Sequence, residues 1–239
     1  MHYRFPDLAI LIRALALLAT LAAAGCAGAY RWDAGSANPA EDQVYEVQRG
    51  DTLYSIAWRY GLDYRTLATR NGIGADFTIY PGQKLALVAE ARAPQSTPVN
   101  VSPSPSRVSE PAPPLPQGAW RWPASGAVIA KFGAPNATGK GITIGGVVGD
   151  PILAAADGKV VYSGSGLIGY GKIIIVKHSE EYLSAYGHND TIYVREGEEV
   201  RQGDRIASMG TGPGNKPLLH FEIRLNGEAV DPLDYLPSR

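Results

Sequence analysis

Runs of strand length, some alternating between apolar and polar residues and some continuously aliphatic, recur along residues 119–239. Turns rich in glycine separate these runs, as at 164–166, 169–171 and 212–214. A period of two is typical of strands with one buried face, and apolar residues at helical spacing are scarce here. We therefore expect an antiparallel all-β domain. The predicted strands are Val128–Phe132, Ile142–Ile144, Lys159–Ser163, Lys172–Lys177, Tyr182–Tyr186, Arg205–Met209 and Leu219–Arg224.

Residues 43–88 carry a different pattern, in which short alternating segments enclose apolar residues at helical spacing. Asp51 and Thr52 are candidate N-caps for a first helix, and Gly61 is placed to end it. Asp63 then opens a second helix. The predicted order is strand, helix, helix, strand, in a module so small that it is only marginally stable alone. The chain as a whole is thus expected to be mainly β.

The N-terminus has the pattern of an export signal. Arg4 and Arg13 lead into an apolar run over residues 14–24, which is too short to span a membrane but fits a signal-peptide core. Small residues then precede Cys26, an arrangement that resembles the lipobox of bacterial lipoproteins. The resemblance implies that residues 1–25 are removed and that Cys26 carries the lipid. The alternative is an ordinary signal peptide in which Cys26 is incidental.

Two further segments are predicted to be linkers. Residues 26–42 are a polar tether, and residues 89–118 are rich in proline and serine and cannot bury a core. The 22 basic and 23 acidic side chains give a formal net charge of -1, which leaves no basic excess for nucleic acid. Cys26 is the one cysteine, which excludes an intramolecular disulfide and a cysteine-based zinc site.

The motifs Val47-x-x-Gly50-Asp51-Thr52-Leu53 and Pro81-Gly82-Gln83 make residues 43–88 resemble the LysM domain. The resemblance implies binding of N-acetylglucosamine-containing glycan, here peptidoglycan strands, in a shallow groove between the loops 50–53 and 77–82. The fold itself needs most of the matched residues, and Leu53 is expected in the core. The candidate glycan-binding residues are Asp51, Thr52, Leu53, Asn71, Phe77, Ile79 and Pro81.

Residues 119–239 resemble the M23 (LytM-type) peptidase domain in the order of their motifs. These are Trp122-Pro123, Phe132-Gly133, Ala155–Val161, Gly169-Tyr170-Gly171, Tyr186-Gly187-His188 and His220-Phe221-Glu222. Active members are zinc endopeptidases with an H-x-G-x-D and an H-x-H motif. The resemblance places Gly139 and Thr143 at the two H-x-G-x-D ligand positions and Leu218 at the first H-x-H histidine. His188 and His220 remain.

These replacements predict the loss of catalysis. A catalytic zinc takes about three protein ligands and an open water position. By resemblance, this chain keeps one of the three ligands, His220. We therefore expect no metal, no cofactor and no catalytic residue. The alternative is an active zinc metallo-endopeptidase that cleaves peptidoglycan cross-links, with a site rebuilt from His188, His220 and Glu222.

Within the M23 family the chain looks closest to the NlpD-like lipoproteins, which are amidase activators. The resemblance implies an outer-membrane lipoprotein that faces the periplasm, is enriched at the division site, and activates an AmiC-like N-acetylmuramoyl-L-alanine amidase for daughter-cell separation. A passive anchor between membrane and glycan is a further alternative. The predicted partner-binding groove is lined by Lys131, Phe132, Tyr170, Tyr182, His188, His220, Glu222 and Arg224.

Overall fold

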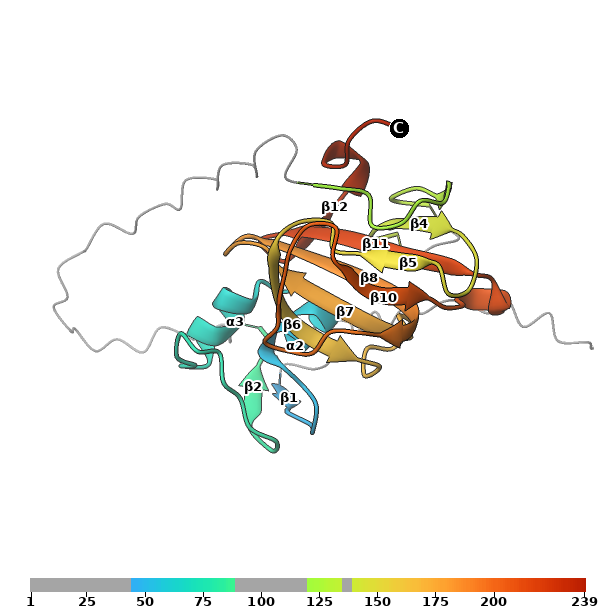
Figure 1. The fold of residues 1–239 in the computed structure, drawn as a ribbon. Helices are drawn as coiled ribbons and strands as arrows, with labels where there is room; N and C mark the ends of the chain where they lie inside the picture. The colour runs from blue at the N-terminus through green and yellow to red at the C-terminus, as the bar shows by residue number, and fades with distance from the viewer. Residues whose placement is uncertain (1–43, 89–119, 135–138) are drawn as a thin grey trace, which may run out of the picture. The chain divides into compact units, whose positions relative to one another are not determined.

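The computed structural model describes residues 44–88, 120–134 and 139–239, all of which belong to one compact unit. The predicted signal peptide, the tether with Cys26 and the linker over residues 89–118 lie outside the described residues. Residues 44–88 form a small helical module, and residues 120–239 form a β domain (Figure 1). The prediction of a mainly β chain with one small helix-containing module is confirmed.

The helical module has the predicted order of elements. Strand β1 (Val44–Glu46), helices α2 (Leu53–Tyr60) and α3 (Tyr64–Arg70) and strand β2 (Lys84–Ala86) follow one another, and the two strands pair antiparallel.

Helix α2 begins where the sequence predicts, and Thr52 is its cap. The Thr52 hydroxyl accepts from the Ser55 backbone N–H at 3.0 Å, and the Ser55 hydroxyl accepts from the Thr52 N–H at 3.0 Å. This reciprocal pair satisfies two N–H groups that a helix N-terminus leaves free. Gly61 ends the helix in the left-handed conformation, at φ 66°. Asp63 caps α3 in turn, through the Thr66 N–H at 2.9 Å.

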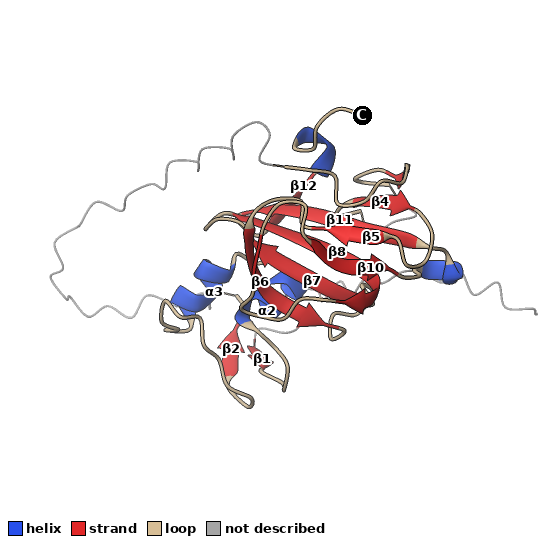
Figure 2. Cartoon of the chain, viewed as in Figure 1, coloured by secondary structure: helices blue, strands red, loops and turns tan. Residues whose placement is uncertain are grey.

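Within its described residues, the β domain contains all seven predicted strands and three more. Its strands are drawn red in Figure 2. The additional strands β5, β9 and β12 have two or three residues each, too few to show an alternation in the sequence. The bounds are β3 Val128–Ala130, β4 Ile142–Gly145, β5 Pro151–Leu153, β6 Gly158–Gly164, β7 Lys172–Lys177, β8 Tyr182–Ile192, β9 Glu199–Val200, β10 Arg205–Met209, β11 Leu218–Leu225 and β12 Glu228–Val230.

One antiparallel sheet holds these strands, in the order β3-β4-β11-β8-β7-β6-β9. Strand β8 is long enough to pair with β11 and β7 along its first part and with β10 near its end. Strand β5 pairs with β10, and β12 with β11. This topology puts β8 and β11 at the centre of the sheet, where both strands are shielded from solvent.

Both faces of the central strands are buried. Ile174 and Val176 of β7 belong to the core of the β domain, which also contains Trp120, Tyr186 and Phe221. Ile173 and Ile175 point the other way, into a second core shared with the helical module. A sheet that is apolar on both sides needs a cover on each, and here the helical module provides the second cover.

Candidate functional site

Strand β11 places three polar side chains in a row on one face of the sheet. His220, Glu222 and Arg224 are spaced by two residues, so they point to the same side. They are 2%, 0% and 2% exposed, respectively. In register with them, β8 offers Gly187, Ala185 and Leu183. We call His220, Glu222 and Arg224 the polar row.

Glu222 is the centre of the polar row, because both of its carboxylate oxygens are bonded. Its Oε1 accepts from the Tyr170 hydroxyl at 2.7 Å and lies 2.9 Å from His220 Nε2. Its Oε2 accepts from Arg224 Nη2 at 3.1 Å and Nε at 3.2 Å. Burial alone would raise the pKa of Glu222, but Arg224, His220 and Tyr170 together hold it below its ordinary value. Glu222 is therefore a buried carboxylate, and His220 Nε2–H is its donor.

His188 lies beside the polar row. It is half-buried, has a left-handed backbone at φ 63°, and donates its N–H to the Tyr170 carbonyl at 2.8 Å. Burial, with a smaller contribution from His220, lowers the pKa of His188 to about 4. The imidazole of His188 is therefore neutral at neutral pH.

The residues that the resemblance places at the M23 ligand positions do not supply three zinc ligands. Thr143, predicted at the aspartate position, pairs with His220 across β4 and β11 and so lies beside it. Gly139, at φ 72°, has no side chain, and Leu218 has no lone pair. Within the described part of the chain, no group of three or more His, Cys, Asp or Glu residues is arranged to hold a metal.

The rebuilt site considered from the sequence is also unfavourable. It would need Glu222 as a ligand together with His188 and His220. Both oxygens of Glu222 already accept hydrogen bonds, two of them from the buried guanidinium of Arg224. Moving Glu222 to a metal would leave that cation buried and unpaired, which is strongly destabilising.

Four of the predicted groove residues are joined by hydrogen bonds, a fifth lies beside them, and Tyr182 lies elsewhere. Tyr170, His220, Glu222 and Arg224 form the hydrogen-bonded cluster, and His188 adjoins it. The placement of Tyr182 in the groove is wrong. Tyr182 pairs with Leu225, so it points away from Arg224 into the opposite core, where its ring lies 6.2 Å from that of Trp120 and 5.8 Å from that of Tyr235.

The other two predicted groove residues lie at the edge of the sheet. Lys131 and Phe132 directly follow β3, the strand beyond β4. The Lys131 side chain is exposed and Phe132 is half-buried. Lys131 and Phe132 are therefore more exposed to solvent than the residues of the polar row.

Arg224 also contacts the helical module, through Trp58, which is not among the residues predicted from the sequence. Its Nη1 donates to the Trp58 carbonyl at 2.8 Å, and its guanidinium carbon lies 3.6 Å from the centre of the Trp58 ring. Trp58 is 2% exposed although it lies outside the apolar stripe of α2 formed by Leu53, Ile56 and Ala57. A large aromatic residue off the stripe was the available signal for a second packing face.

Two of the predicted glycan-binding residues have structural roles. Leu53 is 1% exposed and belongs to the core, so its side chain cannot meet a ligand. Asn71 ties the end of α3 to β2: its Nδ2 donates to the Leu67 carbonyl at 2.8 Å and to the Ala86 carbonyl at 3.1 Å, and its Oδ1 accepts from the Ala86 N–H at 2.7 Å.

Asp51 and Thr52 shape the first predicted glycan loop. Asp51 Oδ2 accepts from the Tyr45 hydroxyl at 2.7 Å and from the Gln48 N–H at 2.8 Å, and Thr52 caps α2. Residues 48–51 also line a surface pocket of about 580 Å³, together with residues 162–166 of the β domain.

The second predicted glycan loop also contains an exposed aromatic residue, Tyr80, which lies within the predicted stretch but is not one of the candidates named singly. Phe77 packs edge-on against Tyr54 and Tyr64, Ile79 is half-buried and Pro81 is exposed. Tyr80, between them, is 69% exposed. An exposed aromatic ring in a predicted sugar-binding loop is suited to packing on the apolar face of a pyranose. In the sequence, the position of Tyr80 within this loop was the feature that could have identified it as a candidate.

Two family models match the chain. The model for the LysM domain matches residues 45–87, within the helical module, and the model for peptidase family M23 matches residues 137–232, within the β domain. In the described part of the chain, none of the helices has the length and hydrophobicity that crossing a bilayer requires.

Relatives align with most of the chain. "Lipoprotein NlpD/LppB homolog" of Pseudomonas aeruginosa is 44% identical over 236 residues, covering 84% of this chain and 79% of the relative. "Uncharacterized lipoprotein YgeR" of Escherichia coli is 42% identical over 225 residues, covering 90% and 88%. "Murein hydrolase activator NlpD" of Escherichia coli is 38% identical over 258 residues, covering 82% and 68%. The chain, with a LysM domain and a peptidase family M23 domain, therefore belongs to the NlpD/LppB family of lipoproteins.

Proposed function

We propose that this chain is an outer-membrane lipoprotein that binds peptidoglycan and activates a periplasmic N-acetylmuramoyl-L-alanine amidase, without catalysis of its own. The observation that carries the proposal is the polar row: a family M23 sheet whose retained His220 is bonded to Glu222, in a relative of proteins named murein hydrolase activators. The role at the septum, in daughter-cell separation, is part of the proposal.

The absence of catalysis rests on the donor set. Zinc hydrolases need protein ligands that leave an open position for the attacking water. At the family's ligand positions this chain has Gly139 and Thr143, and Leu218 replaces a catalytic histidine. Neutral His188 can accept a proton, but the described residues offer it no Lewis acid to activate a water or to polarise a peptide carbonyl. The amidase would supply its own zinc.

Activation would be a shift between two states of the amidase. A regulator changes such an equilibrium only as far as it binds one state more tightly than the other. The proposed contact surface is the polar row with His188 and Tyr170, extended by the accessible residues Lys131 and Phe132 at the sheet edge. An AmiC-like enzyme is the proposed partner.

Glycan binding is proposed for the loops 50–53 and 77–82 of the helical module. Backbone groups there can bond the acetamido groups, and Tyr80 offers a ring for the sugar faces. Lipidation of Cys26, cleavage after residue 25, the boundaries at 26–42, 89–118 and 119–239, and enrichment at the division site stay predictions. Anchoring by lipid and binding to glycan would together hold the chain between membrane and wall.

Reconstitution on purified sacculi tests the proposal. A soluble version that begins at residue 27 should release no muropeptides alone, and should accelerate wall hydrolysis by a periplasmic amidase at least tenfold. The same sample should contain no stoichiometric zinc by elemental analysis.

Two outcomes would replace the proposal. Chelator-sensitive cleavage of cross-link peptides by the chain alone would establish the endopeptidase alternative. If no periplasmic amidase of the host responds, and removal of residues 119–239 leaves cell separation unchanged, the chain is a passive anchor.

A further inference from the structure

A buried arginine joins the β domain to the helical module. Arg224 is 2% exposed, and its guanidinium is shared between Glu222 and the Trp58 carbonyl, with the Trp58 ring stacked on it at 3.6 Å. A cation over an indole ring is attracted by the ring, more strongly where water is excluded. Part of the environment that makes burial of Arg224 tolerable is therefore supplied by helix α2.

The surface under the helical module is otherwise apolar. Ile173 and Ile175 of β7, and Leu183 and Ala185 of β8, are at most 5% exposed and form one core with Trp58 and other residues of the module. Without the module, a contiguous apolar face of the sheet would meet water. Exposed patches of this kind mark binding surfaces, and helix α2 occupies this one.

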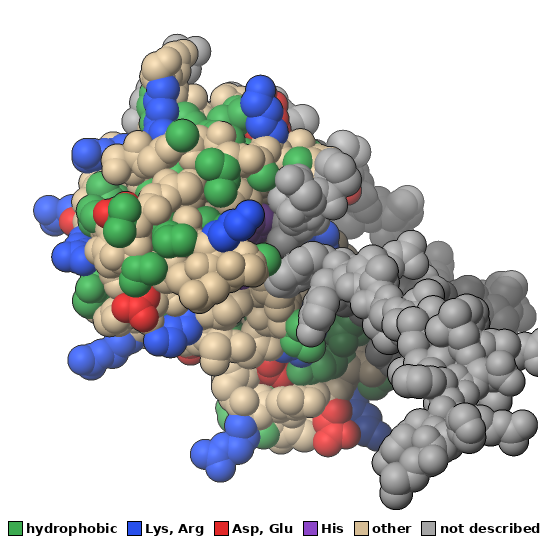
Figure 3. All heavy atoms as spheres, turned by 90° about the vertical axis from the view of Figure 1, so that its right-hand side faces the viewer, with side chains coloured by type: hydrophobic (Ala, Val, Ile, Leu, Met, Phe, Trp, Pro, Cys, Tyr) green, Lys and Arg blue, Asp and Glu red, His purple; other side chains and the backbone are tan. Residues whose placement is uncertain are grey.

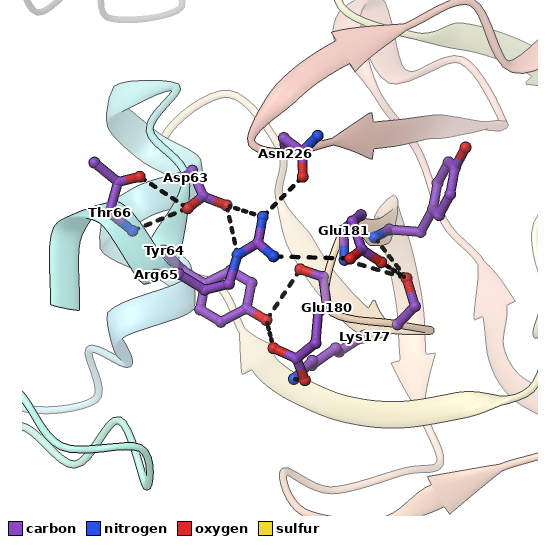
Figure 4. A network of polar contacts seen from close by, with 10 residues as sticks. Asp63, Tyr64, Arg65, Thr66, Lys177, Glu180, Glu181 and Asn226 are labelled. Atoms are coloured by element: carbon purple, nitrogen blue, oxygen red, sulfur yellow. Dashed lines mark hydrogen bonds and ion pairs between the residues drawn. The ribbon is translucent and has the colours of Figure 1, made fainter. Parts of the chain in front are cut away.

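A network of polar contacts joins helix α3 to the β domain beside the apolar centre (Figure 4). The Tyr64 hydroxyl donates to Glu180 Oε2 at 2.9 Å. The Arg65 guanidinium makes two contacts: its Nη2 donates to Asn226 Oδ1 at 2.8 Å, and its Nη1 lies 3.9 Å from Glu181 Oε1. Such partly exposed pairs contribute little net stability. A desolvated aromatic anchor with a weak polar rim is typical of interfaces between separable partners.

Backbones also approach closely at the rim. A Cβ atom built on Gly227, in the turn between β11 and β12, would lie 2.5 Å from the Asp63 backbone nitrogen. Elsewhere along the contact, the Arg59 side chain of α2 bonds to the β domain: its Nη2 donates to the Gly166 carbonyl at 3.2 Å. The surfaces of the helical module and the β domain are thus complementary in shape along helices α2 and α3.

The face that α2 covers is continuous with the polar row. Arg224 is the last member of the row, two residues along β11 from Glu222 and four from His220. A protein that docks on this face of the β domain must therefore displace α2 from Arg224, or remain limited to the part around His188.

We propose that the helical module is a releasable cover of the polar row: Trp58 seated on Arg224 holds it in place within the same chain, and the β domain accepts a protein partner fully only after the module has left. The regulatory half of this inference rests on the proposed activator function. The docking half does not, since it concerns two parts of one chain.

A cross-linking experiment separates the two halves. The soluble version from residue 27 has no cysteine, because Cys26 is the one cysteine of the chain. Cysteines replacing Arg65 and Asn226, whose side chains are hydrogen-bonded in the docked form, should react rapidly with a short bismaleimide that has a cleavable disulfide arm. The product should be a monomer by mass.

Trp58→Lys in this background tests the anchor, because it places a second cation against Arg224 and leaves the stripe of Leu53, Ile56 and Ala57 intact. The cross-linking rate should fall at least tenfold. Trp58→Leu, which keeps an apolar side chain on the helix, should cause a smaller fall in the cross-linking rate. It replaces the lysine variant as the test if that variant does not fold. Tyr80→Ala, at an exposed aromatic residue of the same module, is the matched control and should leave the rate unchanged.

Equal rates for the parent and both Trp58 variants, or cross-links formed only between copies, would overturn the docking. Amidase activation by the cross-linked chain should be at least tenfold below that of the uncross-linked chain and should return on reduction of the arm. Full activation by the cross-linked chain would overturn the regulation while the docking stands. If no form of the chain activates an amidase, the proposed function and the regulation both fall, and the cross-linking rate still decides the docking.

Discussion

At the scale of single residues, hydrogen bonds within the protein hold His220 in place. In the M23 pattern, the His220 position serves a zinc ion, whereas here His220 donates to Glu222, which also binds Tyr170 and Arg224. The cluster satisfies every oxygen of a buried carboxylate. Polar groups that are buried and fully bonded specify one arrangement of a core, so the polar row helps to define how this part of the β domain packs.

Restoring the missing ligands should restore metal binding. The double variant Gly139→His/Thr143→Asp, together with the existing His220, recreates the three family ligands. We expect it to bind zinc at a ratio near one, measured by calorimetric titration and elemental analysis, and we expect the parent not to. The affinity should be weakened by the left-handed backbone at Gly139, which costs a non-glycine residue about 1 kcal/mol.

Thr143→Asp alone is the control, since it still lacks the third ligand. If the double variant binds no better than this single variant, residues 139 and 143 do not occupy the family's ligand positions in space.

His178 predicts how stability depends on pH. Burial lowers its pKa to about 4, while Nδ1 bonds the Asp157 carbonyl and Nε2 the Ser184 hydroxyl, each at 2.7 Å. The unfolded chain takes up this proton near pH 6.5 and the folded chain does not. Stability is therefore lost as the pH falls from about 6.5 to about 4, by on the order of 1–2 kcal/mol for this partly exposed ring.

Chemical unfolding of the parent and of His178→Gln over this pH range measures the effect. The variant should be less stable at pH 7, because hydrogen bonds are lost, and should show a shallower decline toward pH 4. Parallel curves would show that His178 titrates alike in the folded and unfolded chains.

At the scale of elements, the helical module shows that residues of the LysM motif are needed for its fold. Thr52 and Asn71 lie in the LysM motif, yet one caps α2 and the other ties α3 to β2. Motif residues of a very small domain are largely those that its turns and caps require. Exposed positions between them, such as Tyr80, are where ligand contact remains possible.

A pair of variants separates these roles. Asn71→Ala removes three hydrogen bonds and leaves the Ala86 N–H unpaired, so the module should lose about 1–3 kcal/mol of unfolding free energy. Tyr80→Ala should change stability by less than about 0.5 kcal/mol and lower the affinity for N-acetylglucosamine oligomers about fivefold, through a lost stacking contact. Denaturation and calorimetric titration measure the two effects. An unchanged affinity for Tyr80→Ala would remove this residue from the glycan site.

At the scale of the whole molecule, the sheet and the helical module share a core. Figure 3 shows one face of the molecule, on which charged side chains of both signs are scattered and apolar ones occur in small groups. The larger apolar areas are internal, and one of them lies between the module and strands β7 and β8. The stability of the module should therefore depend on the β domain.

Separating the parts should expose this dependence. The fragment 44–88 should melt at least about 5 °C below the same residues in the intact soluble chain, because it loses the packing of Trp58 and Tyr64. Calorimetry of the fragment and of the intact chain tests this, with Tyr80→Ala in both as a control that should not alter the difference. Identical midpoints would mean that the shared core contributes nothing to the module.

The sequence by itself determined the local structure and the family. Alternation located seven strands of the sheet, and the capping residues Thr52, Gly61 and Asp63 set the helix boundaries, because these features depend on neighbours within a few residues. Motif order likewise identified the LysM and M23 domains. The short strands β5, β9 and β12 escaped, since two or three residues carry no period.

Only the tertiary structure decided which side chains meet. Tyr182 lies on the opposite face from the polar row, because strand register, and not membership of a motif, fixes the side to which a residue points. The burial of Arg224 beneath Trp58 joins residues that are 166 positions apart. The aliphatic residues of β7 are buried on both faces of the sheet, and what covers the second face depends on long-range packing, which no local pattern encodes.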